Sequence, residues 1–115
     1  MKKFTLFFGL LLLAAVTFAQ APQAFKYQAV ARDVSGVPLE NQQIAVKISI
    51  LAGSASGDMI YSERHETTTN SMGLFDLEIG NPDEVLAGSF QDIGWGITTC
   101  FLKVELDENG GTNYQ

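Results

Sequence analysis

The sequence predicts an antiparallel β-sandwich, and three observations support this fold class. Short segments alternate apolar and polar residues with the period of two that is typical of strands. Clusters of Gly, Asn, Ser and Pro separate these segments at short intervals. Little of the chain shows a helical period, and it contains no internal repeat. Short strands at this spacing pack as two antiparallel sheets over one core.

Residues 1–19 have the three zones of a secretory signal peptide: a basic start, an apolar run over 4–15, and small residues before the cut. Thr17 and Ala19 occupy the positions that a signal peptidase reads, so cleavage is predicted between Ala19 and Gln20. The leader predicts export through the general secretory route to a secreted or cell-surface location. An uncleaved membrane anchor is the alternative, and it requires a longer apolar span than this one.

Residues 20–115 then form one domain. The whole chain carries a net charge of −6, and the loss of the basic leader makes the mature domain more negative. An acidic surface repels phosphates, so neither nucleic acid nor an anionic membrane surface is an expected partner. No apolar run after the leader is long enough to span a membrane, so no membrane span is expected.

The first half of the mature chain predicts two strands. Residues 25–32 are rich in aromatic and small apolar residues, and the turn cluster 33–36 ends them. Residues 42–51 alternate strictly and form the clearest strand of the chain. The core face of this second strand carries β-branched residues: Ile44, Val46, Ile48 and Ile50.

A flexible loop at 52–58 leads to a third extended segment at 59–69, and a tight turn at 70–73 ends in a left-handed glycine. Residues 74–79 form the fourth predicted strand. Its inward residues are Phe75, Leu77 and Ile79.

The stretch 80–98 departs from this rhythm. Asn81 and Pro82 predict a short helical turn, because Asn caps helices and Pro suits their first position. Large apolar side chains then follow in a loop and are expected to plug an open end of the sheet. They are Phe90, Ile93 and Trp95.

The last complete strand is predicted at 99–106, with one apolar face: Cys100, Leu102, Val104 and Leu106. The single cysteine, Cys100, excludes an intramolecular disulfide and a lipid anchor at the signal cleavage site. The alternation favours Cys100 as a small buried apolar residue, and a reactive or chain-joining thiol is the alternative.

The inward residues are expected to form one contiguous buried cluster between two sheets. Truncating Ile48 or Leu102 to alanine is then expected to cost about 2–5 kcal/mol. The predicted cluster comprises Ile44, Val46, Ile48, Ile50, Phe75, Leu77, Leu102, Val104 and Leu106.

Residues 107–111 predict an acidic hairpin turn, and 112–115 look like the first half of another strand. A sheet that lacks its last strand leaves an edge unpaired, which natural domains usually avoid. The chain is therefore expected to be a fragment of a longer gene product, or to take its last strand from another molecule. A longer chain should be more stable and should associate less.

Four segments, 21–33, 68–80, 93–96 and 101–107, resemble the N-terminal module of secreted or surface proteins of Bacteroidota, often described as hypothetical or tail-fibre-like. This resemblance implies downstream domains of a longer gene product as the first partners of the module.

A second resemblance, over residues 33–39, Val46 and 69–75, is to the transthyretin-like sandwich of carboxypeptidase regulatory domains. It implies an accessory module without catalytic residues. The expected sandwich is therefore of the transthyretin-like or immunoglobulin-like kind, missing its last strand.

The residues that could carry chemistry do not form a recognisable motif, so no enzyme, catalytic residue, metal site or cofactor is expected. His65 is the only histidine, and a metal site needs more imidazole or thiolate partners; an exposed strand residue is predicted instead. Asp76 and Glu78 share a strand face, but the loops around them are too short for a glycosidase cleft. The turn at 107–111 fails the spacing of a calcium-binding loop.

Two functions remain. The first is a non-catalytic secreted module that supports adhesion, assembly or display in a larger cell-surface or exported protein. The alternative is a small carbohydrate-binding module, in which Trp95, Tyr61 or Tyr114 would stack on sugar rings. The expected partners are accordingly protein or glycan at the cell surface.

Cleavage after Ala19 predicts a defined mature N-terminus. Mass spectrometry of exported protein should find a chain that begins at Gln20, as glutamine or in its cyclised pyroglutamate form. Retention of residues 1–19 in the exported protein would refute the predicted site.

Overall fold

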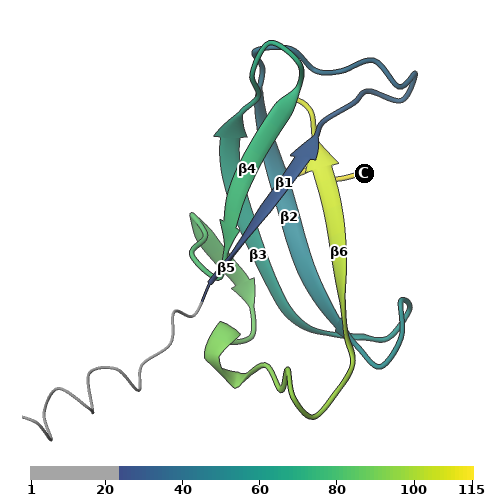
Figure 1. Cartoon of the computed structure of the whole chain (residues 1–115), viewed down its shortest axis with the longest axis vertical. Helices are drawn as coiled ribbons and strands as arrows, with labels where there is room; N and C mark the ends of the chain where they lie inside the picture. The colour runs from purple at the N-terminus through teal and green to yellow at the C-terminus, as the bar shows by residue number, and fades with distance from the viewer. Residues whose placement is uncertain (1–23) are drawn as a thin grey trace, which may run out of the picture.

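The computed structural model describes residues 24–115, so the predicted leader and its cleavage site at Ala19 and Gln20 lie outside the described residues. Strands form two antiparallel sheets, which confirms the predicted all-β sandwich (Figure 1). The two-stranded sheet pairs β1 (Phe25–Val30) with β4 (Leu74–Ile79). The four-stranded sheet has the order β5-β3-β2-β6 and contains β2 (Gln43–Ala52), β3 (Asp58–Thr68), β5 (Glu84–Ala87) and β6 (Cys100–Asp107).

The five complete strands predicted from the sequence are present, with ends shifted by at most a residue or two. The tight turn between β3 and β4 is also confirmed. Gly73 there has a φ of 81°, a left-handed conformation that glycine adopts without steric cost. The Asn70 side-chain oxygen accepts the backbone N–H groups of Met72 and Leu74, at 2.8 and 3.0 Å, and so fixes the turn.

The helical turn predicted at 81–84 is wrong. The chain forms the short strand β5 there, which pairs antiparallel with β3, and a single 3-10 turn follows at Phe90–Asp92. The Asp83 carboxylate accepts the backbone N–H of Glu66 on β3 at 2.7 Å. The hydrogen bonds gained by pairing with β3 therefore outweigh the local preference of Asn81 and Pro82 for a helical turn.

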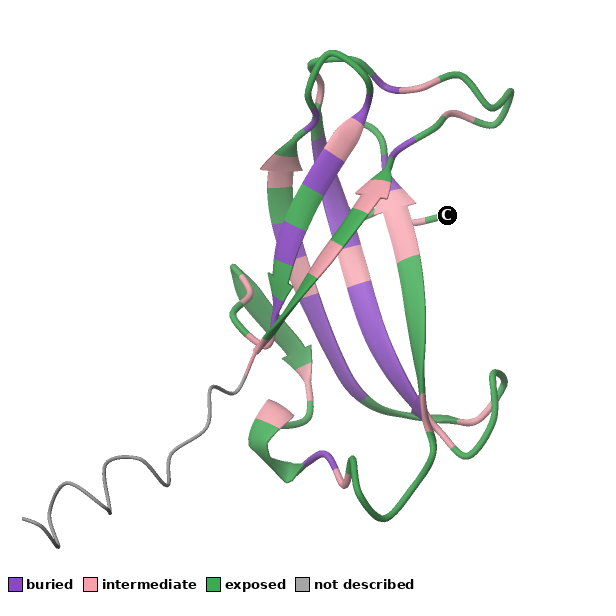
Figure 2. Ribbon diagram, viewed as in Figure 1, coloured by how far each residue is buried: buried purple, intermediate pink, exposed green. Residues whose placement is uncertain are grey.

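The main core lies between β2 and β4, as the alternation predicts. Ile44, Val46 and Ile48 of β2 are buried against Phe75 and Leu77 of β4. Figure 2 shows the buried residues concentrated on β2, β3 and β4. The inward faces of β2 and β4 could be predicted because each of these strands places apolar side chains at every second residue.

The core is not the one cluster that was expected. Ile50 belongs to a second, smaller cluster with Tyr61 and Ile93 at one end of the sandwich, and Phe90 packs against both clusters. The loop after β5 thus plugs this end, as predicted. Cys100 packs against the second cluster but stays partly exposed, so its predicted full burial is wrong.

The predicted burial of β6 is also wrong, although its predicted face is right. Val104 lies opposite Ile48, so its side chain points to the same face as the β2 core. Yet Leu102 and Val104 are 39% and 37% exposed, while Leu106 packs against the main cluster and Cys100 against the second one. The two-stranded sheet lies over β3 and β2 and leaves the outer part of β6 uncovered (Figures 1 and 2).

The different cover of β2 and β6 predicts unequal truncation costs. Ile48→Ala should lower the free energy of unfolding by about 2–5 kcal/mol, because it leaves a cavity in a buried site. Leu102→Ala should cost about 1 kcal/mol, because solvent already reaches the side chain. Denaturant unfolding of both variants measures the difference, and equal losses would contradict this account of the core.

Candidate functional site

A polar cluster lies on the core side of β3. Tyr61, Glu63 and His65 alternate along this strand, so all three side chains face the β1–β4 sheet. The Glu63 carboxylate is 0% exposed and accepts hydrogen bonds from the Tyr61 hydroxyl at 2.7 Å and the Gly80 backbone N–H at 3.0 Å. His65 Nε2 lies in hydrogen-bond contact with the other carboxylate oxygen. The hydrogen-bonding groups of the Glu63 carboxylate thus all find partners inside the sandwich.

This cluster corrects the prediction for His65, which is buried rather than exposed. Burial, together with the hydrogen bond and the negative charge of Glu63, raises the pKa of Tyr61, so the phenol stays protonated and donates. The sequence contained a signal for this cluster. Tyr61, Glu63 and His65 share one strand face, so an inward Tyr61 brings both titratable residues with it.

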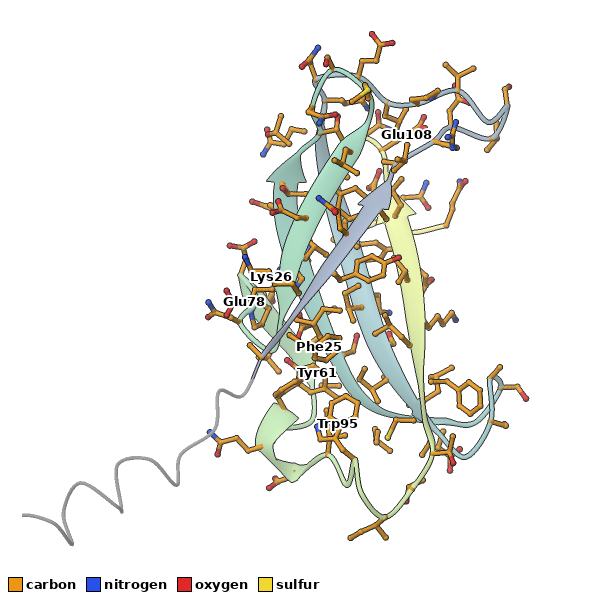
Figure 3. All side chains as sticks on the ribbon, in the orientation of Figure 1. Phe25, Lys26, Tyr61, Glu78, Trp95 and Glu108 are labelled. Atoms are coloured by element: carbon orange, nitrogen blue, oxygen red, sulfur yellow. The ribbon has the colours of Figure 1, made fainter. Side chains whose placement is uncertain are left out.

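The aromatic residues proposed as sugar platforms do not share a surface. Tyr61 is only 1% exposed, so its ring cannot stack on a ligand, and that part of the prediction is wrong. Trp95 is 47% exposed and lies at the plugged end (Figure 3). The planes of the Phe25 and Phe90 rings make angles of 85° and 61° with the plane of its ring. These edge-on contacts are packing contacts.

Tyr114 lies on the opposite face of the four-stranded sheet. Its hydroxyl accepts a hydrogen bond from Arg64 Nε at 2.9 Å, and Lys47 Nζ stands 5.7 Å from the ring centroid. Arg64 and Lys47 point to this outer face because they alternate with core-facing residues on β3 and β2. Tyr114 therefore fastens the C-terminal residues to the sheet.

At the outer edge of β6, backbone groups without a strand partner among the described residues coincide with exposed apolar side chains. Leu106 and Gln115 exchange both backbone hydrogen bonds, at 3.0 and 2.9 Å, which is the pattern of a directly opposed antiparallel pair. Backbone groups of alternate residues point to the same edge, so those of Val104 and Leu102 do too. Within residues 24–115 these groups have no strand partner, since β6 pairs only with β2.

A well-ordered turn returns the chain from β6 to this edge. The Asp107 carboxylate accepts the backbone N–H groups of Asn109 and Asn113, both at 2.9 Å. Arg64 donates to the carbonyls of Gly110 and Gly111 at 3.0 and 3.1 Å. These contacts hold the acidic turn predicted at 107–111.

The strand expected at 112–115 is absent as a regular element, and only Gln115 pairs with β6. Beside the turn lies a hollow of about 300 Å³, whose lining includes Leu106, Gln115 and the loop residue Arg32. The hollow thus lies at the Leu106 end of β6.

The described part of the chain holds neither a metal-binding group nor a membrane-spanning helix. Among residues 24–115, no group of three or more His, Cys, Asp and Glu side chains is placed to hold a metal ion. Over the same range, no helix has the length and apolar character needed to cross a membrane.

The fold is a small all-β sandwich, and the outer edge of β6 is one of its strand edges that have no strand partner among residues 24–115. The model of one protein family, described as a domain of unknown function (DUF8740), matches residues 26–115, and the chain belongs to this family. No curated protein and no solved structure matches the chain. The resemblances to Bacteroidota surface proteins and to transthyretin-like domains stay predictions.

The hydrogen bonds of Asp107 predict a pH dependence of the return turn. The backbone N–H groups of Asn109 and Asn113 lower the pKa of this carboxyl below its ordinary value of 3.8. The stabilisation by the ionised form is therefore complete above the ordinary value and is lost as the pH falls through the lowered one. The amide NMR signals of Asn109 and Asn113 should move toward random-coil positions in that acid range.

Asp107→Asn should remove this transition, because no charge is left to titrate. Glu108→Gln is the matched control, since it neutralises the neighbouring carboxyl and should leave the transition in place. Amide signals that ignore pH in the parent protein would contradict the role of Asp107.

Proposed function

We propose that the chain is a non-catalytic secreted module that supports adhesion, assembly or display within a larger cell-surface or exported protein. The observation that carries this proposal is the outer edge of β6, where Leu102 and Val104 are exposed and their outward backbone groups have no strand partner within residues 24–115. Such an edge is a template for another polypeptide strand. The surface is therefore built to associate with protein.

The charge of this edge suits a strand partner. Lys103 and Glu105 alternate with the apolar residues of β6 on its other face, and their side chains stand 3.7 Å apart. This local pair is neutral although the whole chain has a net charge of −6. An approaching strand therefore meets little repulsion at β6, whereas the acidic surface elsewhere disfavours nucleic acid.

The buried titratable groups support a non-catalytic role. A general acid or base must come within hydrogen-bond reach of its substrate. Both carboxylate oxygens of Glu63 are instead occupied by Tyr61, Gly80 and His65, inside the sandwich. These residues stabilise the domain.

The aromatic residues favour the protein-binding module over the carbohydrate-binding alternative. A sugar platform requires exposed rings that lie near one another with parallel faces. Tyr61 is buried, Tyr114 is bound to Arg64, and Trp95 meets its aromatic neighbours edge-on. The three rings therefore serve the fold.

The location of a tagged protein tests the proposed function. The protein is expressed in a bacterium with an epitope tag after Gln115. The tagged protein should lack residues 1–19, and protease added to intact cells should remove the tag. The matched control replaces Leu11 and Leu12 by arginine, which interrupts the apolar run and should leave the tag inside. Tag that stays in the cytoplasm with the leader attached would overturn export and display.

A further inference from the structure

The contact between Leu106 and Gln115 gives the β6 edge a direction and a register. Because the two residues exchange both backbone hydrogen bonds, the chain at Gln115 runs antiparallel to β6. A strand that continued from Gln115 would travel along β6 toward Cys100. The second residue after Gln115 would then face Val104, and the fourth would face Leu102.

The backbone of β6 is ready for this pairing. The carbonyl of Thr99 accepts the backbone N–H of Gly53 at 2.8 Å, which shows that odd-numbered residues of this segment bond inward, toward β2. Even-numbered residues therefore present their N–H and C=O groups outward, as Leu106 does. The outward backbone groups of Val104 and Leu102 thus lie along the same edge of β6 as those of Leu106, which already bond to Gln115.

The side chains of the same residues set the chemistry of the occupant. Leu102 and Val104 extend the apolar face of Ile50 and Ile48 but lack cover from the two-stranded sheet. Apolar residues placed opposite them would continue the core face across one more strand. On the other face, a cation would suit Glu105 and an anion would suit Lys103.

The return turn holds Gln115 in this position. Asp107 accepts backbone N–H groups of the turn, Arg64 holds its carbonyls, and the Tyr114 hydroxyl accepts from Arg64. These bonds fix the residues that precede Gln115, whose pairing with Leu106 sets the register. A strand attached here therefore loses little entropy when it docks, in contrast to a free peptide.

We propose that the β6 edge from Leu106 to Cys100 is a strand-acceptor site, occupied by an antiparallel strand that runs on from Gln115 and presents apolar residues to Val104 and Leu102. This inference rests on the proposed function, since the strand comes from the rest of the larger protein. Docking makes β6 an interior strand and covers the apolar side chains that are now exposed.

Two extended proteins of identical composition test the acceptor site. The first carries Lys-Val-Glu-Val-Thr after Gln115, which places valines against Val104 and Leu102 and charges against Glu105 and Lys103. The matched control carries Val-Lys-Val-Glu-Thr, which turns the valines to the outer face and the charges to the core face. Both are compared with the unextended protein.

Only the first extension should occupy the edge. The amide protons of Val104 and Leu102 should exchange with solvent at least about tenfold more slowly than in the control. The midpoint of thermal unfolding should rise by about 4–8 °C over the control. Equal exchange and equal midpoints in the two extended proteins would overturn the proposal.

A second outcome would also overturn it. If these amides are already protected in the unextended protein, with protection that rises with concentration alongside a dimer in sedimentation, a second copy occupies the edge instead. All of these measurements use purified protein and are independent of export. Their failure would therefore leave the location of the tagged protein to decide the proposed function.

Discussion

The buried carboxylate of Glu63 is the constraint on which the arrangement of the two sheets depends. A carboxylate without water is tolerated only when hydrogen bonds replace its hydration. Two of its partners lie beside it on β3, and the third is the backbone N–H of Gly80, directly after β4. Gly80 has a φ of 102°, a conformation that favours glycine. Glu63 therefore ties the end of the two-stranded sheet to the middle of β3.

This tie determines what remains uncovered. With β4 held against β3, the small sheet covers β3 and β2, and too few strands remain to reach the outer part of β6. The stable core and the open edge are thus two consequences of one packing arrangement. The acidic return turn belongs to the open side, since Arg64 and Asp107 place Gln115 beside β6.

A few residues depart from the usual distribution of residue types on each of these two sides. Glutamate and histidine lie in the interior, where they stabilise the fold, while leucine and valine line an exposed edge. Titratable residues are the usual guides to catalysis, and here they lead to a structural cluster. The proposed interaction surface consists of aliphatic side chains and backbone groups, for which sequence motifs carry no signature.

The sequence by itself determined five of the strands and the faces of β2, β4 and β6. Strict alternation in β2 and β4, and the apolar face of β6, were predicted correctly because the period of two is a local property. Near the start of β3, the adjacent residues Met59, Ile60 and Tyr61 are all apolar, so the alternation does not show which of them points inward. The buried cluster of Tyr61, Glu63 and His65 was therefore missed.

Tertiary structure alone decided what covers each face. The small sheet buries Ile48 and leaves Val104 exposed, although the two side chains lie opposite each other on the same side of one sheet. Pairing with β3 likewise made a strand of the segment that was expected to form a helical turn. Alternation specifies the side of the strand to which a residue points, whereas burial requires another element above it, and only long-range packing supplies that element.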